Sequence, residues 1–501
     1  MREVAAQLTP PFRLRMFTRL SRKQAPSTGG ATGARPLYRV GSLTYTRGAL
    51  WQVMFWMLWG DFCFVIMESL VPSLVPLQLR WVGAGDTLVG ALTNSLPSFI
   101  GILMNPIVGM QSDRHRGRLG RRRPFLLWCT PPVVISLVLL GAAKPAGAFL
   151  QRILANLGGG NLTIAAWTII WIGLCVFVFV IFNTYILQVY QFLFADVIPE
   201  KIMGTFVGIY RAIGALGALA FNRWVLGWAQ TYTLHIYLLA ALLYASSFML
   251  LVWRVKEGSY PPPPELRPGR GRLALLGVYF RECFRHRFYL NVYCLPFFFW
   301  SAIVPFATFV LFFATSAGQP RYANTIGLTL MEFGRVKGWT SLVQVPVFFI
   351  VGPIVDRFHP VRVAMVGLSL ASFSYFACFW FIRGPTTLLL WLVINQGACA
   401  IFLGAYLALL PRLFPREKYG QFFSANQIVG FSGVVISPML CGVILETIRD
   451  YRYIFAWCGA CAAIGFVASI TLFTQWKKLG GDMQYTPPGV EGGELDPQPA
   501  T

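Results

Sequence analysis

The chain has 501 residues, of which 56% are apolar and only 12% are charged. A soluble domain carries about 25% charged residues, so this composition excludes an ordinary soluble protein. The net charge is +23, but Arg and Lys lie mostly in short gaps between apolar runs. That placement indicates membrane orientation rather than a nucleic-acid surface. No phosphate-binding glycine loop, nucleophile elbow or metal-ligating cluster stands out, so we expect no enzyme and no cofactor or metal.

Residues 1–48 are basic and rich in Arg, Ser, Pro and Gly. They lack the apolar core of about 7–15 residues that a cleavable signal peptide needs. We interpret them as a basic cytoplasmic tail attracted to anionic lipid. The run from Arg13 to Lys23 also resembles an organelle transit peptide, which is the alternative.

Twelve apolar segments follow, each about as long as the roughly 20 residues that cross a bilayer as a helix. They cover 49–77, 86–111, 124–143, 164–193, 203–228, 234–253, 288–316, 338–355, 361–382, 386–410, 420–446 and 453–475. The sequence therefore predicts an all-α integral membrane protein with twelve transmembrane helices.

Most of the 42 basic residues lie in the first tail, the central gap, the last tail and the other gaps of the same parity. Cytoplasmic loops carry such an excess, so both termini are predicted to be cytoplasmic, in a cytoplasmic or plasma membrane. The central gap, 255–287, contains the stiff run Pro261–Pro264 and divides the spans into bundles 49–254 and 288–476, before a tail 477–501. The halves also echo each other, since Asn105-Pro-Ile-Val108 precedes Asp113 and Gly352-Pro-Ile-Val355 precedes Asp356.

Two stretches resemble a known family. Residues 109–125, G-M-Q-S-D-R-H-R-G-R-L-G-R-R-R-P-F, look like the loop between the second and third helices of the major facilitator superfamily. They are most similar to the version in sucrose–proton symporters and their animal relatives, in the glycoside–pentoside–hexuronide cation symporter group. Residues 60–68, G-D-F-C-F-V-I-M-E, resemble the first-helix pattern G-R-E-F-C-Y-A-V-E of the animal branch, with Asp in place of its first Glu. The resemblance implies the major facilitator fold, with two six-helix bundles.

The first span contains two carboxylic acids, Asp61 and Glu68, which are seven residues apart and share one helix face. An ionisable group at the bilayer centre costs about 2.5–3.5 kcal/mol, so each acid needs a functional or structural reason. We interpret Glu68 as the deeper acid and Asp61 as lying near one end of the span. Both are candidates for proton coupling, with a structural ion pair to Arg211 as the alternative.

Arg211 is the one cation that the scan places well inside the fifth span. The resemblance implies that an acid on the first helix and an Arg on the fifth approach each other near the midplane. A guanidinium can bind sugar hydroxyls or hold a carboxylate until it is protonated. The sequence therefore predicts that Glu68 pairs with Arg211.

Uncharged polar and aromatic residues inside other spans are the remaining candidates for substrate binding. They are Asn183, Gln188 and Gln191 on the fourth span, Trp300 on the seventh, and Asn395 and Gln396 on the tenth. Amides bind hydroxyls and aromatic rings stack on sugars, whereas interhelical hydrogen bonding is the equally simple alternative.

The resemblance also suggests a conformational latch on the cytoplasmic side. Its members would be Asp113, Arg114, Arg121, Arg122 and Arg123 in the first half, with Asp356 and Arg357 at the equivalent place in the second. The alternative is that these arginines only set the topology, and both roles are compatible.

These features predict a secondary transporter that moves a sugar or glycoside with protons by alternating access, acting as a monomer in the bilayer. Sodium is not excluded as the coupling ion. One alternative is a carrier for a nucleoside, organic acid or drug, and another is a membrane receptor that transports nothing. An organic-acid carrier would favour additional cations inside the spans, and the scan finds only Arg211.

Overall fold

The computed structural model describes residues 38–40, 42–156, 162–258, 279–315, 322–415 and 419–488. Long helices dominate these residues, and the predicted all-α membrane fold is confirmed. Eleven helices in the described part are long and apolar enough to cross a membrane. A further helix occupies the fifth predicted span, so a helix stands at each of the twelve predicted positions.

The first half packs into one bundle, whose interior is mostly aliphatic and also contains the aromatic cluster of Phe64, Tyr190, Tyr244 and Phe248. Its helices are α1 (Arg47–Trp81), α2 (Asp86–Gly90), α3 (Leu96–Arg114), α4 (Arg123–Gly141), α6 (Ile164–Val197), α7 (Glu200–Ala220) and α8 (Thr233–Arg254). The π-helical turn η1 (Ala91–Ser95) joins α2 to α3, and α7 continues through the π-helical turn η2 (Phe221–Val225) and the 3-10 turn η3 (Leu226–Trp228).

The second half forms the other bundle. Its helices are α10 (Arg287–Ala314), α11 (Leu330–Ser341), α12 (Gln344–Phe358), α13 (Pro360–Phe381), α14 (Pro385–Leu413), α15 (Tyr419–Ile448) and α16 (Tyr453–Lys478). The eighth span was predicted to begin at residue 338, but the helix begins at Leu330. A capping box explains the earlier start, because Thr329 and Glu332 satisfy each other's backbone N–H groups.

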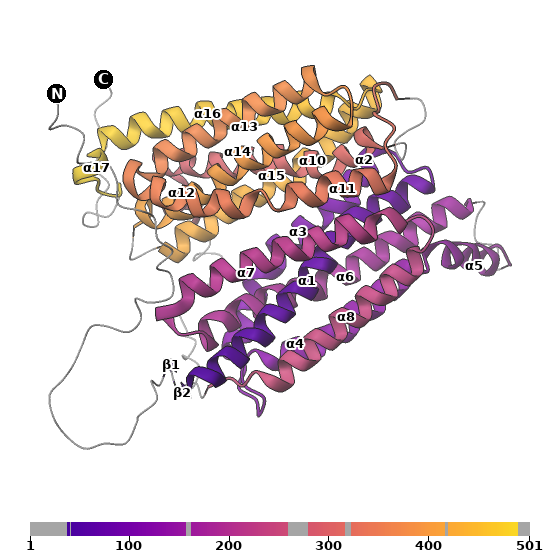
Figure 1. Cartoon of the computed structure of the whole chain (residues 1–501), viewed down its shortest axis with the longest axis horizontal. Coiled ribbons are helices and arrows are strands. Elements are labelled where there is room, and N and C mark those ends of the chain that lie inside the picture. The colour runs from indigo at the N-terminus through magenta and orange to yellow at the C-terminus, as the bar shows by residue number, and fades with distance from the viewer. Residues whose placement is uncertain are drawn as a thin grey trace, which may run out of the picture.

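The two bundles lie side by side, as Figure 1 shows in indigo to magenta for the first and orange to yellow for the second. We call the end that carries the α1–α2 connection (82–85) the far end, and the end that carries the first strands and the last short helix the termini end. At the far end, α15 packs on α2, η1 and α3, and α11 packs on η2, η3 and α7. The bundles separate toward the termini end (Figure 1).

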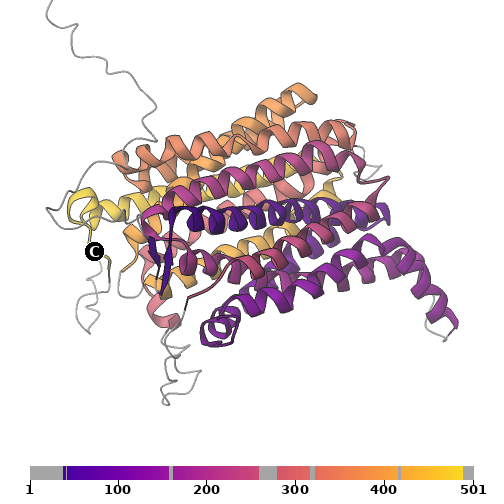
Figure 2. The same cartoon turned by 60° about the horizontal axis from the view of Figure 1, so that its bottom comes forward.

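Several elements outside the spans were not predicted. A hairpin of β1 (Tyr38–Val40) and β2 (Leu43–Tyr45) precedes α1, within the region interpreted as a tail. Helix α5 (Ala143–Asn156) follows α4, and both views place it at the end opposite the C-terminus (Figures 1 and 2). The short helix α17 (Gly481–Gln484) ends the described chain.

The segment after α16 is docked on the termini end of the second bundle. The Tyr485 hydroxyl donates to the Leu413 carbonyl at 2.8 Å, and the Tyr289 hydroxyl donates to the Pro488 carbonyl at 2.9 Å. Asp482 pairs with Arg362 at 2.6 Å. These contacts hold together the ends of α10, α13 and α14, so part of the predicted tail 477–501 is folded structure.

Candidate functional site

Asp61 is fully buried in the middle of the first bundle, with 0% of its surface exposed. On one side of α1, Tyr190 of α6 donates its hydroxyl to the Met57 carbonyl. On the other side, Gly214 of α7 lies so close that a Cβ there would sit 3.5 Å from Asp61 Oδ2. A carboxylic acid is therefore enclosed by three helices within the membrane-spanning part of the protein.

Glu68 lies two helical turns further along α1, about 10.5 Å along the axis, and its side chain is exposed. The sequence interpretation placed Asp61 near one end of the span and Glu68 deeper, but both acids lie near the middle of the helix. Helix α1 is 35 residues long, so both acids lie within four residues of its middle at Phe64. Exposure is decided by neighbouring helices, since α7 covers Asp61 at a glycine and leaves Glu68 open.

Arg211 lies on α7, and its side chain is outside what the structure describes. Its position is three residues before Gly214, which lies against Asp61. Positions three apart occupy the same side of a helix. The backbone therefore brings position 211 one turn from the contact with Asp61.

Two of the predicted amides serve helix packing in this conformation. The Asn183 side-chain oxygen accepts a hydrogen bond from the Tyr244 hydroxyl of α8 at 2.9 Å. Asn395 is fully buried and donates to the Ser374 hydroxyl of α13 at 2.8 Å. Both contacts stay within one bundle, as the alternative of interhelical hydrogen bonding anticipated.

The other predicted substrate-binding residues are more open. Gln191 is exposed on α6, and Gln188 is half-buried three residues before it. Gln396 on α14 is also half-buried. Trp300 of α10 lies against α15, where a Cβ on Gly430 would sit 3.6 Å from Trp300 Cδ1. These four side chains retain polar or aromatic surface for a bound solute.

At the termini end, the arginine-rich loop is held by two acids that the sequence interpretation did not single out. Asp196, at the end of α6, receives hydrogen bonds from Arg121 Nε and Arg122 Nε, each at 3.2 Å. The carboxylate of Glu257 accepts hydrogen bonds from the backbone N–H groups at the start of α4. The distance from Arg123 N to Glu257 Oε1 is 2.7 Å. The loop is thus tied to the ends of α6 and α8 in its own bundle.

The rest of the predicted latch is only partly described. The side chains of Asp113, Arg114 and Asp356 lie outside the described residues, and Arg357 is exposed. The latch therefore stays a prediction, with Asp196 and Glu257 as additional members of the network.

At the far end, a buried ion pair closes the seam between the bundles. Arg80 pairs with Asp86 across the α1–α2 connection, and their side chains are 5% and 0% exposed. Residues of the other bundle cover this pair: the Arg80 guanidinium lies 4.8 Å from the centre of the Phe312 ring, and the Tyr451 hydroxyl lies 3.4 Å from Asp86 Oδ1. An ion pair in the first bundle is shielded from water only while the second bundle stays in place.

A second far-end contact joins the bundles directly. The Glu446 carboxylate of α15 accepts from the Thr87 backbone N–H and from the Thr87 hydroxyl, both at 2.8 Å. Thr87 is in the first turn of α2, so the negative charge also meets the positive end of that helix. Deeper in the seam, Asn94 donates to the Thr308 hydroxyl at 2.9 Å.

Glycines let the backbones touch at this seal. A Cβ on Gly90 would lie 2.6 Å from the Pro438 carbonyl oxygen, and one on Gly442 would lie 2.7 Å from Thr87 N. On the other side of the seam, Gly334 of α11 meets the carbonyl of Asn222 in η2. No side chain fits at these positions while the far end is closed.

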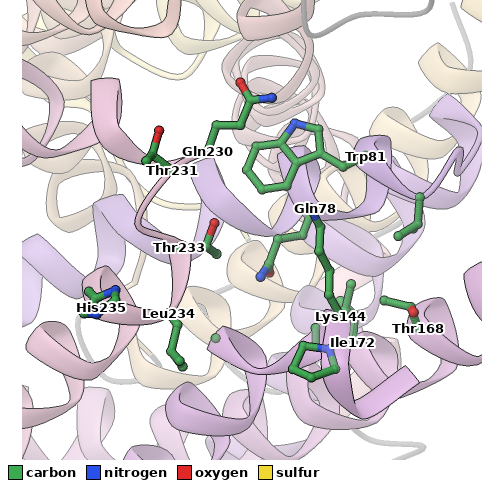
Figure 3. Close-up of a pocket in the computed structure, with 14 residues that line it drawn as sticks. Gln78, Trp81, Lys144, Thr168, Ile172, Gln230, Thr231, Thr233, Leu234 and His235 are labelled. Carbon is green, nitrogen blue, oxygen red and sulfur yellow. The ribbon is translucent and has the colours of Figure 1, made fainter. Parts of the chain in front are cut away.

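A separate cavity of about 240 Å³ opens at the far end within the first bundle, between α1, α5, α6 and α8. Figure 3 shows Gln78, Trp81, Lys144 and His235 around it. Gln78 is already bonded, since its amide donates to the Leu140 carbonyl at 3.0 Å and its oxygen accepts from Tyr237 at 3.1 Å. The cavity lies apart from the seam, so we do not assign it to the main site.

A comparison with known protein families agrees with this architecture of two helical bundles around a seam. The family model described as Major Facilitator Superfamily matches residues 62–382 and 319–488. The chain belongs to the Major Facilitator Superfamily. It is therefore a membrane transporter, and the far-end contacts close the seam between its two halves.

Individual relatives are distant. The transporter is 27% identical to solute carrier family 45 member 4 of Mus musculus over 237 residues, which make up 46% of this chain and 29% of the mouse protein. The solved nucleoside transporter NupG, as a D323A mutant, superposes with a TM-score of 0.63 at 13% identity, covering 85% of this chain and 100% of that one. A D-xylose–proton symporter gives 0.59 at 14% identity, covering 84% and 97%. These structures share the fold.

The sequence of this transporter did not predict most of the contacts that close the far end. Arg80 and Asp86 flank a short gap between apolar runs, where charges are ordinary. The cover of Asp86 by Tyr451 and the approach of Glu446 to Thr87 are contacts between residues about 360 positions apart. The sequence did contain one signal of these contacts, because glycine stands at positions 85, 90 and 442. Glycine in a membrane helix is typical of positions where two backbones approach closely.

Proposed function

We propose that this major facilitator moves a sugar or glycoside together with protons by alternating access. The observation that carries the proposal is the placement of two acids on one face of α1. Asp61 is buried at the contact with α7, and Glu68 is exposed seven residues later. A charged carboxylate facing lipid at this depth would be costly, so the exposure of Glu68 supports a water-filled path beside it.

The acid that we propose as the partner of Arg211 is Asp61, in place of Glu68. Gly214 of α7 lies against Asp61, and position 211 precedes it by one turn on the same side of the helix. Protonation of Asp61 would release the guanidinium to bind substrate hydroxyls. Glu68 would pass protons between this buried acid and water.

The substrate class rests on the resemblance to sucrose–proton symporters and on polar and aromatic side chains within the spans that are not fully buried. Gln188, Gln191, Trp300 and Gln396 supply amides and an aromatic ring. A D-xylose–proton symporter is among the proteins with the same fold, and this agrees with the proposal. With cytoplasmic termini, the closed far end would face outside, which makes this conformation inward-facing.

The test is transport into proteoliposomes with and without an inward pH gradient. Wild type should accumulate the sugar only with the gradient, whereas Asp61→Asn should exchange sugar across the membrane but no longer accumulate it. Glu68→Gln should slow accumulation without abolishing it. Gradient-driven accumulation by Asp61→Asn would refute the coupling role of Asp61, and accumulation by wild type without any gradient would refute proton coupling.

A further inference from the structure

Lys337 is a cation inside a membrane span, and the proposed proton coupling through Asp61, Glu68 and Arg211 does not involve it. It lies on α11, in the membrane-spanning segment Leu330–Val355, eight residues into the helix. The sequence scan began this span at 338 and therefore counted Lys337 as a loop residue. The actual helix start makes it an intramembrane lysine, which requires a reason.

The helix geometry fixes which side of α11 Lys337 occupies. Trp339 is 59% exposed, and Arg335 and Glu332 share its exposed side. Lys337 lies two residues, or about 200°, from Trp339 and so on the opposite side. The neighbours on the inner side are Gly334 and Gly338, which pack against η2 and α7 of the first bundle.

Lys337 is nevertheless only half-buried. Its side of α11 is opposite the exposed side that carries Glu332, Arg335 and Trp339. Because α11 contacts α7 of the first bundle and α14 of the second, Lys337 lies on a helix at the seam between the bundles.

The charge of Lys337 is not compensated within the described part of the chain. Its ammonium group makes no hydrogen bond or ion pair with a described residue, and its contact with the Phe333 ring, at 5.8 Å, is weak. The acid on the same helix is engaged elsewhere, since Glu332 accepts from the Thr329 N–H and hydroxyl at 2.9 Å. An ammonium group with three donors and no partner among the described residues is suited to bind an anion.

We propose that Lys337 binds a carboxylate of the transported solute, so that the substrate is an anionic sugar derivative and not a neutral sugar. This rests on the proposed transport of sugars and specifies the substrate class of the same path. It also revises the expectation drawn from the sequence, where the shortage of cations inside the spans argued against an acid as the substrate.

The first experiment is equilibrium binding to the purified protein, without a pH gradient. Thermal stabilisation by gluconate and glucuronate is compared with that by glucose, in wild type, Lys337→Gln and Arg335→Gln. Arg335→Gln is the matched control, because it removes one positive charge from the exposed side of the same helix. Loss of a charge-assisted hydrogen bond should weaken carboxylate binding about ten- to hundredfold in Lys337→Gln.

The expected result is that the carboxylates stabilise wild type and Arg335→Gln alike, and glucose does not. Failure of both carboxylates to bind wild type would overturn the substrate class, as would equal binding by Lys337→Gln. These outcomes need no gradient, so they are independent of whether protons drive transport.

A second measurement requires no ligand. Cysteine at position 337 should react with a negatively charged, water-soluble thiol reagent, whereas cysteine at Trp339 should be protected by lipid. An unreactive cysteine at position 337 would show that the residue does not face the water-filled path, and would also overturn the proposal.

Discussion

The glycine seal at the far end predicts how a single methyl group should shift the conformational equilibrium. Gly442 of α15 packs on the first turn of α2, where a Cβ would lie 2.7 Å from both N and Cα of Thr87. These are backbone atoms, so no side-chain rotation can make room. Overpacking of this kind costs about 1–3 kcal/mol, and the cost applies only while the far end is closed.

Gly442→Ala should therefore disfavour the closed far end by about 5- to 150-fold relative to states in which the halves separate there. Gly90→Ala should act in the same direction from the other bundle, since its Cβ would lie 2.6 Å from the Pro438 carbonyl oxygen. Gly101→Ala on α3 is the matched control, because nothing lies within 4 Å of a Cβ at that position.

The assay is the rate at which a membrane-impermeant maleimide labels a cysteine placed at Ser95. This residue is 9% exposed and donates to the Val435 carbonyl across the seam. Labelling should be faster in Gly442→Ala and Gly90→Ala than in Gly101→Ala, with the protein lacking the added cysteine as background. Equal labelling rates in all three variants, with melting temperatures unchanged, would refute the idea that these glycines stabilise the closed far end.

Two further predictions concern the termini end. Asp196→Asn should destabilise the first bundle by about 1.5–3 kcal/mol, because it weakens the hydrogen bonds from Arg121 and Arg122. Asp482→Asn, which removes an exposed ion pair with Arg362, should cost less than about 1 kcal/mol. Equal shifts of the thermal unfolding temperature in the two variants would contradict this. Burial lowers the pKa of His359 to about 4 from its ordinary 6.5, so an unfolded chain takes up the proton first as the pH falls. Stability should then decrease from pH 6.5 toward pH 4, and melting curves of His359→Asn should lose part of this pH dependence.

The two acids on α1 show that the burial of a side chain cannot be predicted from the sequence alone. The seven-residue spacing correctly places Asp61 and Glu68 on one face of α1. Which of them is buried depends on the neighbouring helices, since Gly214 of α7, about 150 positions away in the chain, lies against Asp61. Likewise, Lys337 was counted as a loop residue because the capping box at Thr329, rather than hydropathy, sets the start of α11.

What the sequence determined by itself is the membrane class and the approximate position of each span. Those properties follow from the length and apolarity of continuous segments, since a helix in lipid must satisfy its backbone within itself. The tertiary structure alone decided which charges are buried, which are paired and which end of the seam is closed. Packing between the two bundles buries the Arg80–Asp86 pair under Phe312 and Tyr451 and brings Glu446 to Thr87, although these partners are far apart in the chain. Hydropathy carries no information about such pairings, because it averages over a helix and ignores which helix lies beside it.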